Sequence, residues 1–366
     1  MINAIYTTIS IVLASALFVL GLLFYSLSCN SETPVFRRVL RIMVFTYCFF
    51  GLINVLELWS RTFLPETEDV LLFQMTTLIV AASQAFLFTF TLILLIHAAY
   101  FTRKRVLREI AYIFTFSILF VALYFILPAA WHKISVWLFT LFYGCLLIRY
   151  TRLFTITYRN CRRKMENFFS DREAEHLKWV NFSFYAALSI GVLTLAASLF
   201  PVMHIGVLCS AICFIFYCYF ACRLINYGNI YEKLAVALAD DVPQSEQPDE
   251  DKNRLPSAIV ESIENKLKVW LNEKRFLQPG VTIDDLSLQI GTNRNYLSMY
   301  INSTKGKTFR QWINELRIDY AKQLFDQNPE LELWQIAEQT GYTDNSYFSK
   351  CFKKITQTTP SKYRKN

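Results

Sequence analysis

Two short stretches in the last third of the sequence carry polar side chains whose types and spacing suit contacts with another molecule. Their amide, hydroxyl, guanidinium and ammonium groups lie along one face of a short predicted helix. Side chains of this kind hydrogen-bond to base edges in the major groove of DNA. The predicted base-contacting residues are Arg294, Asn295 and Ser298 in the first stretch and Asn345, Ser346, Ser349 and Lys350 in the second.

Each stretch belongs to a pair of short helices joined by a tight turn, over residues 282–301 and 331–352. A glycine stands at each turn, Gly291 and Gly341, where a sharp change of direction often needs a positive φ that glycine adopts without strain. The second helix of each pair has an apolar stripe that we expect to be buried. That stripe comprises Tyr296, Leu297, Tyr300 and Ile301, then Tyr347, Phe348 and Phe352. Because the tripeptides Tyr-Leu-Ser and Tyr-Phe-Ser take the same place in the two pairs, the pairs form an internal repeat.

These motifs resemble the DNA-binding domain of the AraC/XylS family of transcriptional regulators over residues 257–366, about the last third of the chain. Two strings carry the resemblance, residues 296–325 and 336–365, and the second is the more specific. Within it the family's spacing is kept by Gly341, Phe348, Phe352, Pro360, Tyr363 and Arg364. The resemblance implies two recognition helices that enter successive major grooves on one face of the duplex, held apart by a long helix. We expect that helix over residues 308–326, with a core stripe of Phe309, Trp312, Ile313, Leu316, Tyr320 and Leu324.

Basic side chains around the same two helix pairs are predicted to contact DNA phosphates, because lysine and arginine neutralise phosphate charge whatever the base sequence. The predicted phosphate-contacting residues are Lys305, Lys307, Lys353, Lys354, Lys362, Arg364 and Lys365. In the first helix pair, Met299 stands where a longer polar side chain often appears in the family. We therefore expect base reading to depend more on the second recognition helix than on the first.

The part of the chain before about Gly228 is far more apolar than the rest. Hydrophobic residues make up 54% of the 366 residues and charged residues only 18%. Seven apolar runs in this part each come near the ~20 residues that a helix needs to cross a bilayer. We place them at residues 4–28, 39–59, 71–100, 110–127, 134–149, 180–200 and 202–224, the fifth being short. The sequence thus predicts a seven-span membrane domain over residues 1–228.

Lysine and arginine alternate between the connections that join these runs. The basic residues of the first, third and fifth connections are Arg37, Arg38 and Arg41; Arg103, Lys104, Arg105 and Arg108; and Arg152, Arg159, Arg162, Arg163, Lys164, Arg172 and Lys178. The second and fourth connections carry one each, Arg61 and Lys133, and the sixth carries none. Because basic loops stay on the cytoplasmic side, we expect a multi-pass protein of the inner (cytoplasmic) membrane. Its N-terminus would face outward, and its C-terminal domain would lie in the cytoplasm.

Two segments connect the predicted domains or lie beside them. The fifth connection mixes basic residues with Phe168 and Phe169, which we interpret as a helix lying on an anionic lipid surface. Residues 229–256 are expected to form a helical extension followed by a linker. That linker has six acidic residues, three prolines and no aromatic residue over 239–256, a composition typical of flexible segments.

Polar residues within the predicted spans leave two interpretations open. Glu57, Gln74, Gln84 and Asn181 suit either a ligand site or scattered hydrogen bonds between helices. The i, i+4 cysteine pairs 209/213 and 218/222 could in principle bind a metal, but small residues for helix packing are the favoured interpretation. We predict no metal site and no cofactor.

Motifs of the common enzyme classes were not found in the sequence, including HExxH, Walker A, GxSxG and a glycine-rich dinucleotide fingerprint. We therefore predict no catalytic residues. Because all the elements predicted above are helices, the expected fold class is all-α. Our hypothesis is a membrane-bound, sequence-specific transcriptional regulator that senses an unknown signal through its membrane domain. The alternative is a transporter or channel-like membrane protein with a regulatory cytoplasmic tail. The expected partners are double-stranded DNA, the lipid bilayer, RNA polymerase, a small-molecule or membrane signal, and a second copy of the chain.

Overall fold

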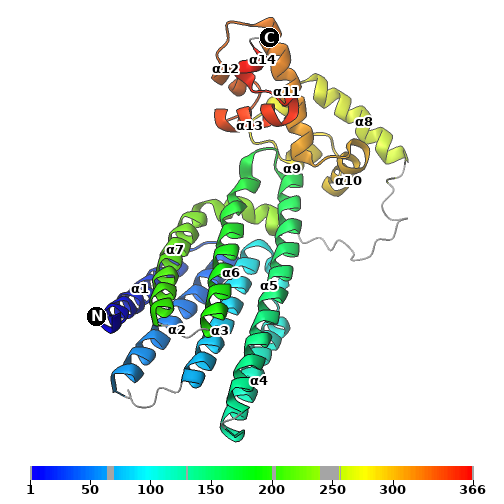
Figure 1. Cartoon of the computed structure of the whole chain (residues 1–366). Coiled ribbons are helices and arrows are strands. Elements are labelled where there is room, and N and C mark those ends of the chain that lie inside the picture. Colours follow the sequence, from blue (N-terminus) through cyan, green and yellow to red (C-terminus); the bar gives the residue numbers. More distant parts are fainter. Residues whose placement is uncertain are drawn as a thin grey trace. The chain divides into compact units, whose positions relative to one another are not determined.

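The computed structural model describes residues 2–63, 70–128, 131–199, 203–239, 255 and 257–364 (Figure 1). All the named elements over these residues are helices, which confirms the predicted all-α class. The chain divides into two compact units. The first comprises Met1–Arg159 and Lys178–Ala239, and the second comprises Asn160–Leu177 and Asp240–Asn366.

Seven long apolar helices build the first unit and lie beside one another in Figure 1. They are α1 (Ile2–Asn30), α2 (Pro34–Phe63), α3 (Val70–Ile96), α4 (Arg103–Ile126), α5 (His132–Phe168), α6 (Lys178–Leu199) and α7 (Met203–Ala239), with the short η2 (Ala98–Tyr100) after α3. Each of the seven has a stretch long and apolar enough to cross a membrane. The described helices are therefore compatible with the predicted multi-pass domain.

Helix α5 is much longer than the predicted fifth span, which was placed at residues 134–149. It runs for 37 residues, from His132 to Phe168. The sequence has no glycine or proline after Gly144 in this stretch, so nothing interrupts the backbone hydrogen bonds where the side chains become basic. Residues up to Arg159 belong to the first unit, and those from Asn160 belong to the second.

Hydrogen bonds between helices account for two of the polar residues predicted within the spans. The Tyr6 hydroxyl donates to Glu57 at 2.5 Å, which connects α1 to α2. The Gln84 amide donates to the Tyr217 hydroxyl at 2.7 Å, which connects α3 to α7. For these residues the structure favours helix association over the ligand-site interpretation.

A buried carboxylate that is not among the polar residues predicted above connects α4 to α5. Glu109 is only 3% exposed and accepts a hydrogen bond from the Arg149 guanidinium. The Tyr150 hydroxyl donates to the same carboxylate oxygen at 3.3 Å. A buried charge is tolerated when it is paired and hydrogen-bonded in this way.

The second unit contains the two predicted helix pairs and the long helix between them. Its elements are η4 (Arg172–Leu177), α8 (Ser257–Asn272), η6 (Arg275–Leu277), α9 (Ile283–Gln289), α10 (Arg294–Lys305), α11 (Phe309–Gln327), α12 (Leu333–Gln339), α13 (Asn345–Thr356) and α14 (Pro360–Tyr363). Helix α11 agrees with the long helix expected over residues 308–326. Gly291 and Gly341 have φ values of +58° and +82°, so both turns use the conformation expected of them. The acidic stretch of the predicted linker, residues 240–254, lies outside the described residues.

Candidate nucleic-acid interface

Side-chain caps set the first residue of each predicted recognition helix. The Asn293 side chain accepts from the Asn295 backbone N–H at 2.7 Å and begins α10. The Asp344 side chain accepts from the N–H groups of Ser346 and Tyr347 at 2.7 and 3.0 Å and begins α13. Such caps satisfy backbone donors that have no partner inside the helix. The first turns, where a recognition helix reads bases, therefore have a defined geometry.

Helix α13 presents its predicted base-contacting face to the surface. The exposed residues on this face are Asn345, Ser346, Ser349 and Lys350. The opposite face is buried through Tyr347, Phe348 and Phe352, as the apolar stripe predicted. The helix is thus anchored on one side and offers two hydroxyls, an amide and an ammonium group on the other.

Helix α10 offers fewer unengaged polar groups. Asn295 is exposed, and Ser298 is half-buried with its hydroxyl accepting from the Asn302 amide at 3.3 Å. Arg294 is half-buried, and its guanidinium lies 3.3 Å from an Asp284 carboxylate oxygen and 5.7 Å from the ring centre of Phe168. Arg294 and Ser298 are thus engaged within the protein, and the smaller share of the first helix in base reading stays a prediction.

The prediction that Tyr296 is buried was wrong, because its side chain is 43% exposed. Leu297, Tyr300 and Ile301 already form the buried stripe of α10. Tyr347, which takes the same place in α13, is buried in the core formed with α11, and its hydroxyl accepts from Arg310 at 2.9 Å. An exposed tyrosine therefore adds an aromatic hydrogen-bonding group to the surface of the first recognition helix.

The predicted phosphate-contacting residues fall into three groups. The exposed ones are Lys305, Lys353, Lys354 and Lys362, whereas Lys365 lies outside the described residues. Lys307 is half-buried and paired with Glu315. Arg364 donates to the backbone carbonyls of Pro329 and Leu331. Phosphate contact stays a prediction for all seven. Lys307 and Arg364 would have to exchange a protein partner for DNA.

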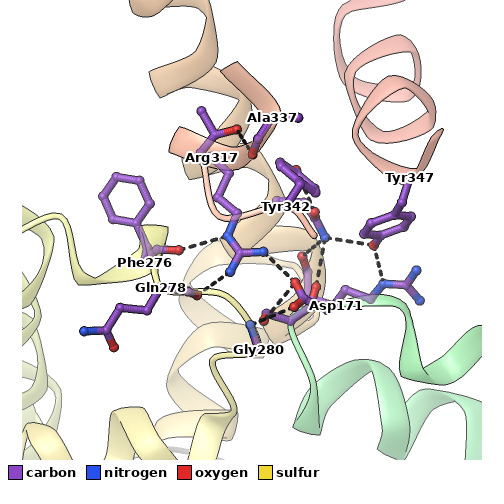
Figure 2. A network of polar contacts seen from close by, with 12 residues as sticks. Asp171, Phe276, Gln278, Gly280, Arg317, Ala337, Tyr342 and Tyr347 are labelled. Carbon is purple, nitrogen blue, oxygen red and sulfur yellow. Dashed lines mark hydrogen bonds and ion pairs between the residues drawn. The ribbon is translucent and has the colours of Figure 1, made fainter. Parts of the chain in front are cut away.

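Arg317 of α11 lies at the centre of the polar network in Figure 2. Its side chain is 0% exposed, and its guanidinium donates to the carbonyls of Phe276 at 2.9 Å and Gln278 at 2.7 Å. The remaining nitrogen donates to the Asp171 carboxylate at 2.6 Å. The buried charge is thereby paired and hydrogen-bonded, as burial requires. Arg317 joins the long helix to the loop before α9 and to residues 160–177.

Asn314, one turn before Arg317, connects the long helix to the second helix pair. Its amide accepts from the Tyr342 hydroxyl at 2.8 Å and donates to the Tyr347 hydroxyl at 3.3 Å and to the Ser170 carbonyl at 3.3 Å. Burial raises the pKa of the Tyr347 phenol above its usual value, so the group stays protonated at physiological pH. Tyr347 therefore enters this network as a neutral hydroxyl.

The interpretation of the fifth connection as a lipid-bound helix was wrong for its two phenylalanines. Phe168 and Phe169 are 8% and 9% exposed, and Phe169 pairs with Thr282 in an antiparallel β-bridge within the second unit. Their apolar surface is covered by protein and cannot enter a lipid headgroup layer. The sequence contained one signal for Arg317, because it stands in an i, i+4 row with the apolar Ile313 and Ala321. We found no comparable signal for Asp171.

Comparisons with known proteins support a helix-turn-helix domain in the second unit. Residues 286–366 match a family model described as a helix-turn-helix domain. The chain is 27% identical over 143 residues to the Msm operon regulatory protein of Streptococcus mutans, covering 39% of this chain and 48% of that protein. It is 28% identical over 109 residues to the probable transcription factor PqrA of Proteus vulgaris, covering 30% and 88%. It is 38% identical over 79 residues to the TCP pilus virulence regulatory protein of Vibrio cholerae, covering 22% and 28%. The chain therefore spans about half the length of the first of these relatives.

Proposed function

Since the C-terminal part of the chain carries an AraC-type helix-turn-helix domain, we propose that the whole protein is a membrane-bound transcriptional regulator. It binds specific sequences of double-stranded DNA and responds to a signal received by its seven-helix unit. The observation that carries the proposal is the exposed polar face of α13 on a domain whose chain also has seven helices apolar enough to span a membrane. The three relatives described above are named as regulatory proteins or as a probable transcription factor, which supports a regulatory rather than an enzymatic role.

Mapping the DNA sites of the full-length chain in living cells tests this function. We expect crosslinking and immunoprecipitation to enrich discrete sites upstream of genes, and those genes would indicate the signal. RNA polymerase and a second copy of the chain are the protein partners we would look for at these sites. Enrichment no greater than that of a chain lacking residues 257–366 would overturn the proposal.

Base reading by α13 leads to a first mutational prediction. Lys350→Ala and Asn345→Ala remove exposed groups that face away from the core. One good side-chain contact to a base discriminates by ~1–3 kcal/mol. We therefore expect each variant to lose preference at one or two base positions of the site. Selection of binding sites from a random DNA pool would show this, whereas an equal loss on specific and random DNA would indicate phosphate contact alone.

Lys353→Ala is the matched control, because Lys353 is also exposed on α13 and is predicted to contact phosphate. We expect this variant to bind all sequences more weakly by the same factor. The slope of log affinity against log salt concentration should decrease by about one, as for one lost phosphate contact. A change of base preference in Lys353→Ala would contradict the division between the two classes.

Orientation in the cytoplasmic membrane is also a proposal, supported by the alternation of lysine and arginine between the connections. Reporters fused after Lys104 or Lys164 should be active in the cytoplasm, and reporters fused after Glu66 or Lys133 should be active outside. Alkaline phosphatase and a fluorescent protein report opposite sides and check each other. One inconsistent fusion would shift a span, and two would contradict the seven-span topology.

A further inference from the structure

Residues Asn160–Leu177, called the docking segment below, form part of the second unit although they lie between two helices of the first unit in sequence. The segment pairs in antiparallel fashion with residues 280–282. Phe169 bridges Thr282, and the Ser170 N–H donates to the Val281 carbonyl at 3.2 Å. The Asp171 carboxylate accepts from the Gly280 N–H at 2.7 Å. Residues 169–171, between the end of α5 and η4, are thus bound along a backbone edge, a common mode of peptide recognition.

The docking segment also contacts three arginines of the DNA-binding domain. Asp171 pairs with Arg317 at 2.6 Å, and Glu166 lies 4.0 Å from Arg310. The Phe168 ring lies against the Arg294 guanidinium. Two carboxylates and one aromatic ring of the segment therefore contact three cationic side chains of this domain.

These contacts lie at the starts of both recognition helices. Arg294 is the first residue of α10 and a predicted base contact. Arg310 donates to the Tyr347 hydroxyl in the first turn of α13, and Asn314 bonds both Tyr347 and the Ser170 carbonyl. The first turn of a recognition helix is the part that approaches bases. Among the predicted base-contacting residues the docking segment contacts Arg294, whereas at α13 it reaches Tyr347 on the buried face of the helix.

We propose that the docking segment and DNA compete for the start of α10, where the Phe168 ring lies against Arg294, so that the docked state binds DNA weakly. The proposal rests on DNA binding by this domain. Because the docking segment is continuous with α5 and α6 in sequence, a displacement of either helix in the membrane unit changes how well the segment docks. Signal transmission then needs no rigid path through residues 240–256.

Asp171→Asn tests the competition in the full-length chain, reconstituted in lipid nanodiscs. The substitution removes the charge that pairs with Arg317 and lowers the population of the docked state. When only a fraction of molecules is competent, apparent affinity rises with that fraction. We expect DNA binding to tighten about tenfold, as for loss of one charge-assisted hydrogen bond. Asp326→Asn, an equal charge change at an exposed position of α11, is the control and should leave affinity within about twofold.

A reversible crosslink gives a second test, in which one and the same chain is compared with the segment held docked and with the segment released. In the register of the Phe169–Thr282 bridge, Ser170 lies opposite Val281. The variant Ser170→Cys with Val281→Cys, added to Asp171→Asn, should therefore form a disulfide that keeps the segment docked. We expect weak DNA binding when it is oxidised and tight binding after dithiothreitol. Ser170→Cys with Asp171→Asn, without the second cysteine, should bind tightly in both conditions.

The outcomes separate this inference from the proposed function. Equal DNA binding by the oxidised and reduced crosslinking variant overturns the competition and leaves the DNA-binding function intact. Weaker binding when the crosslink is reduced also overturns it, because the docked segment would then support DNA binding. A chain that binds no specific DNA in any of these states overturns the proposed function itself.

Discussion

Gly341→Ala is expected to destabilise the second unit by about 3 kcal/mol or more. Gly341 has a φ of +82°, a conformation that costs an L-residue ~1–2 kcal/mol. A Cβ atom would also lie 2.3 Å from the Leu277 carbonyl oxygen and 2.8 Å from its carbon. Both are backbone atoms that cannot rotate away, so the turn between α12 and α13 must separate from the end of η6. We expect amide hydrogen exchange over residues 330–356 to accelerate and DNA binding to be lost.

Gly306→Ala is the matched control for this prediction. Gly306 follows α10 with a φ of +65°, but nothing lies within 4 Å of the position a Cβ would take. Only the backbone term remains, about 1–2 kcal/mol. Hydrogen exchange in the full-length chain reports both variants locally, without interference from the apolar helices. Equal destabilisation by the two substitutions would contradict a close approach of Gly341 to Leu277.

Arg317→Met is expected to cost the second unit ~3–5 kcal/mol, the usual consequence of breaking a buried ion pair from one side. Methionine fills a similar space but has no donors. The carbonyls of Phe276 and Gln278 and the carboxylate of Asp171 then lose their partner together. The loop before α9 should separate from α11 and expose the core under both helix pairs. Hydrogen exchange and thermal unfolding of the full-length chain measure the loss.

Lys322→Met gives the reference for Arg317→Met, because it removes a positive charge from the same helix at a position where the ion pair, with Asp319, is partly exposed. Such a pair contributes ~0–1 kcal/mol. Adding Asp171→Asn to Arg317→Met should recover part of the loss, since the orphaned carboxylate no longer has to be buried as an ion. An Arg317→Met variant as stable as Lys322→Met would show that the network in Figure 2 does not hold the unit together.

Most secondary structure of this chain could be predicted from local patterns. The length and apolarity of seven runs, the helical period of the stripe that includes Trp312 and Ile313, and the glycines at two turns are properties of neighbouring residues. They depend little on what packs opposite. The same holds for the repeat that indicated two helix-turn-helix units. Helix α5 was predicted too short because the expected span ended where the side chains became basic, whereas the backbone hydrogen bonds continue to Phe168.

Tertiary structure decided which chemically similar residues play different parts. Tyr296 and Tyr347 occupy equal places in the repeat, yet only Tyr347 has Arg310 and Asn314 of α11 opposite its hydroxyl, and only Tyr347 is buried. Arg317 is buried because its donors find two loop carbonyls and Asp171, which is 146 residues earlier in the chain. Charge and periodicity along the sequence cannot reveal such a partner. Whether a polar or aromatic side chain is buried depends on the groups that the fold brings to it, and these come from distant parts of the chain.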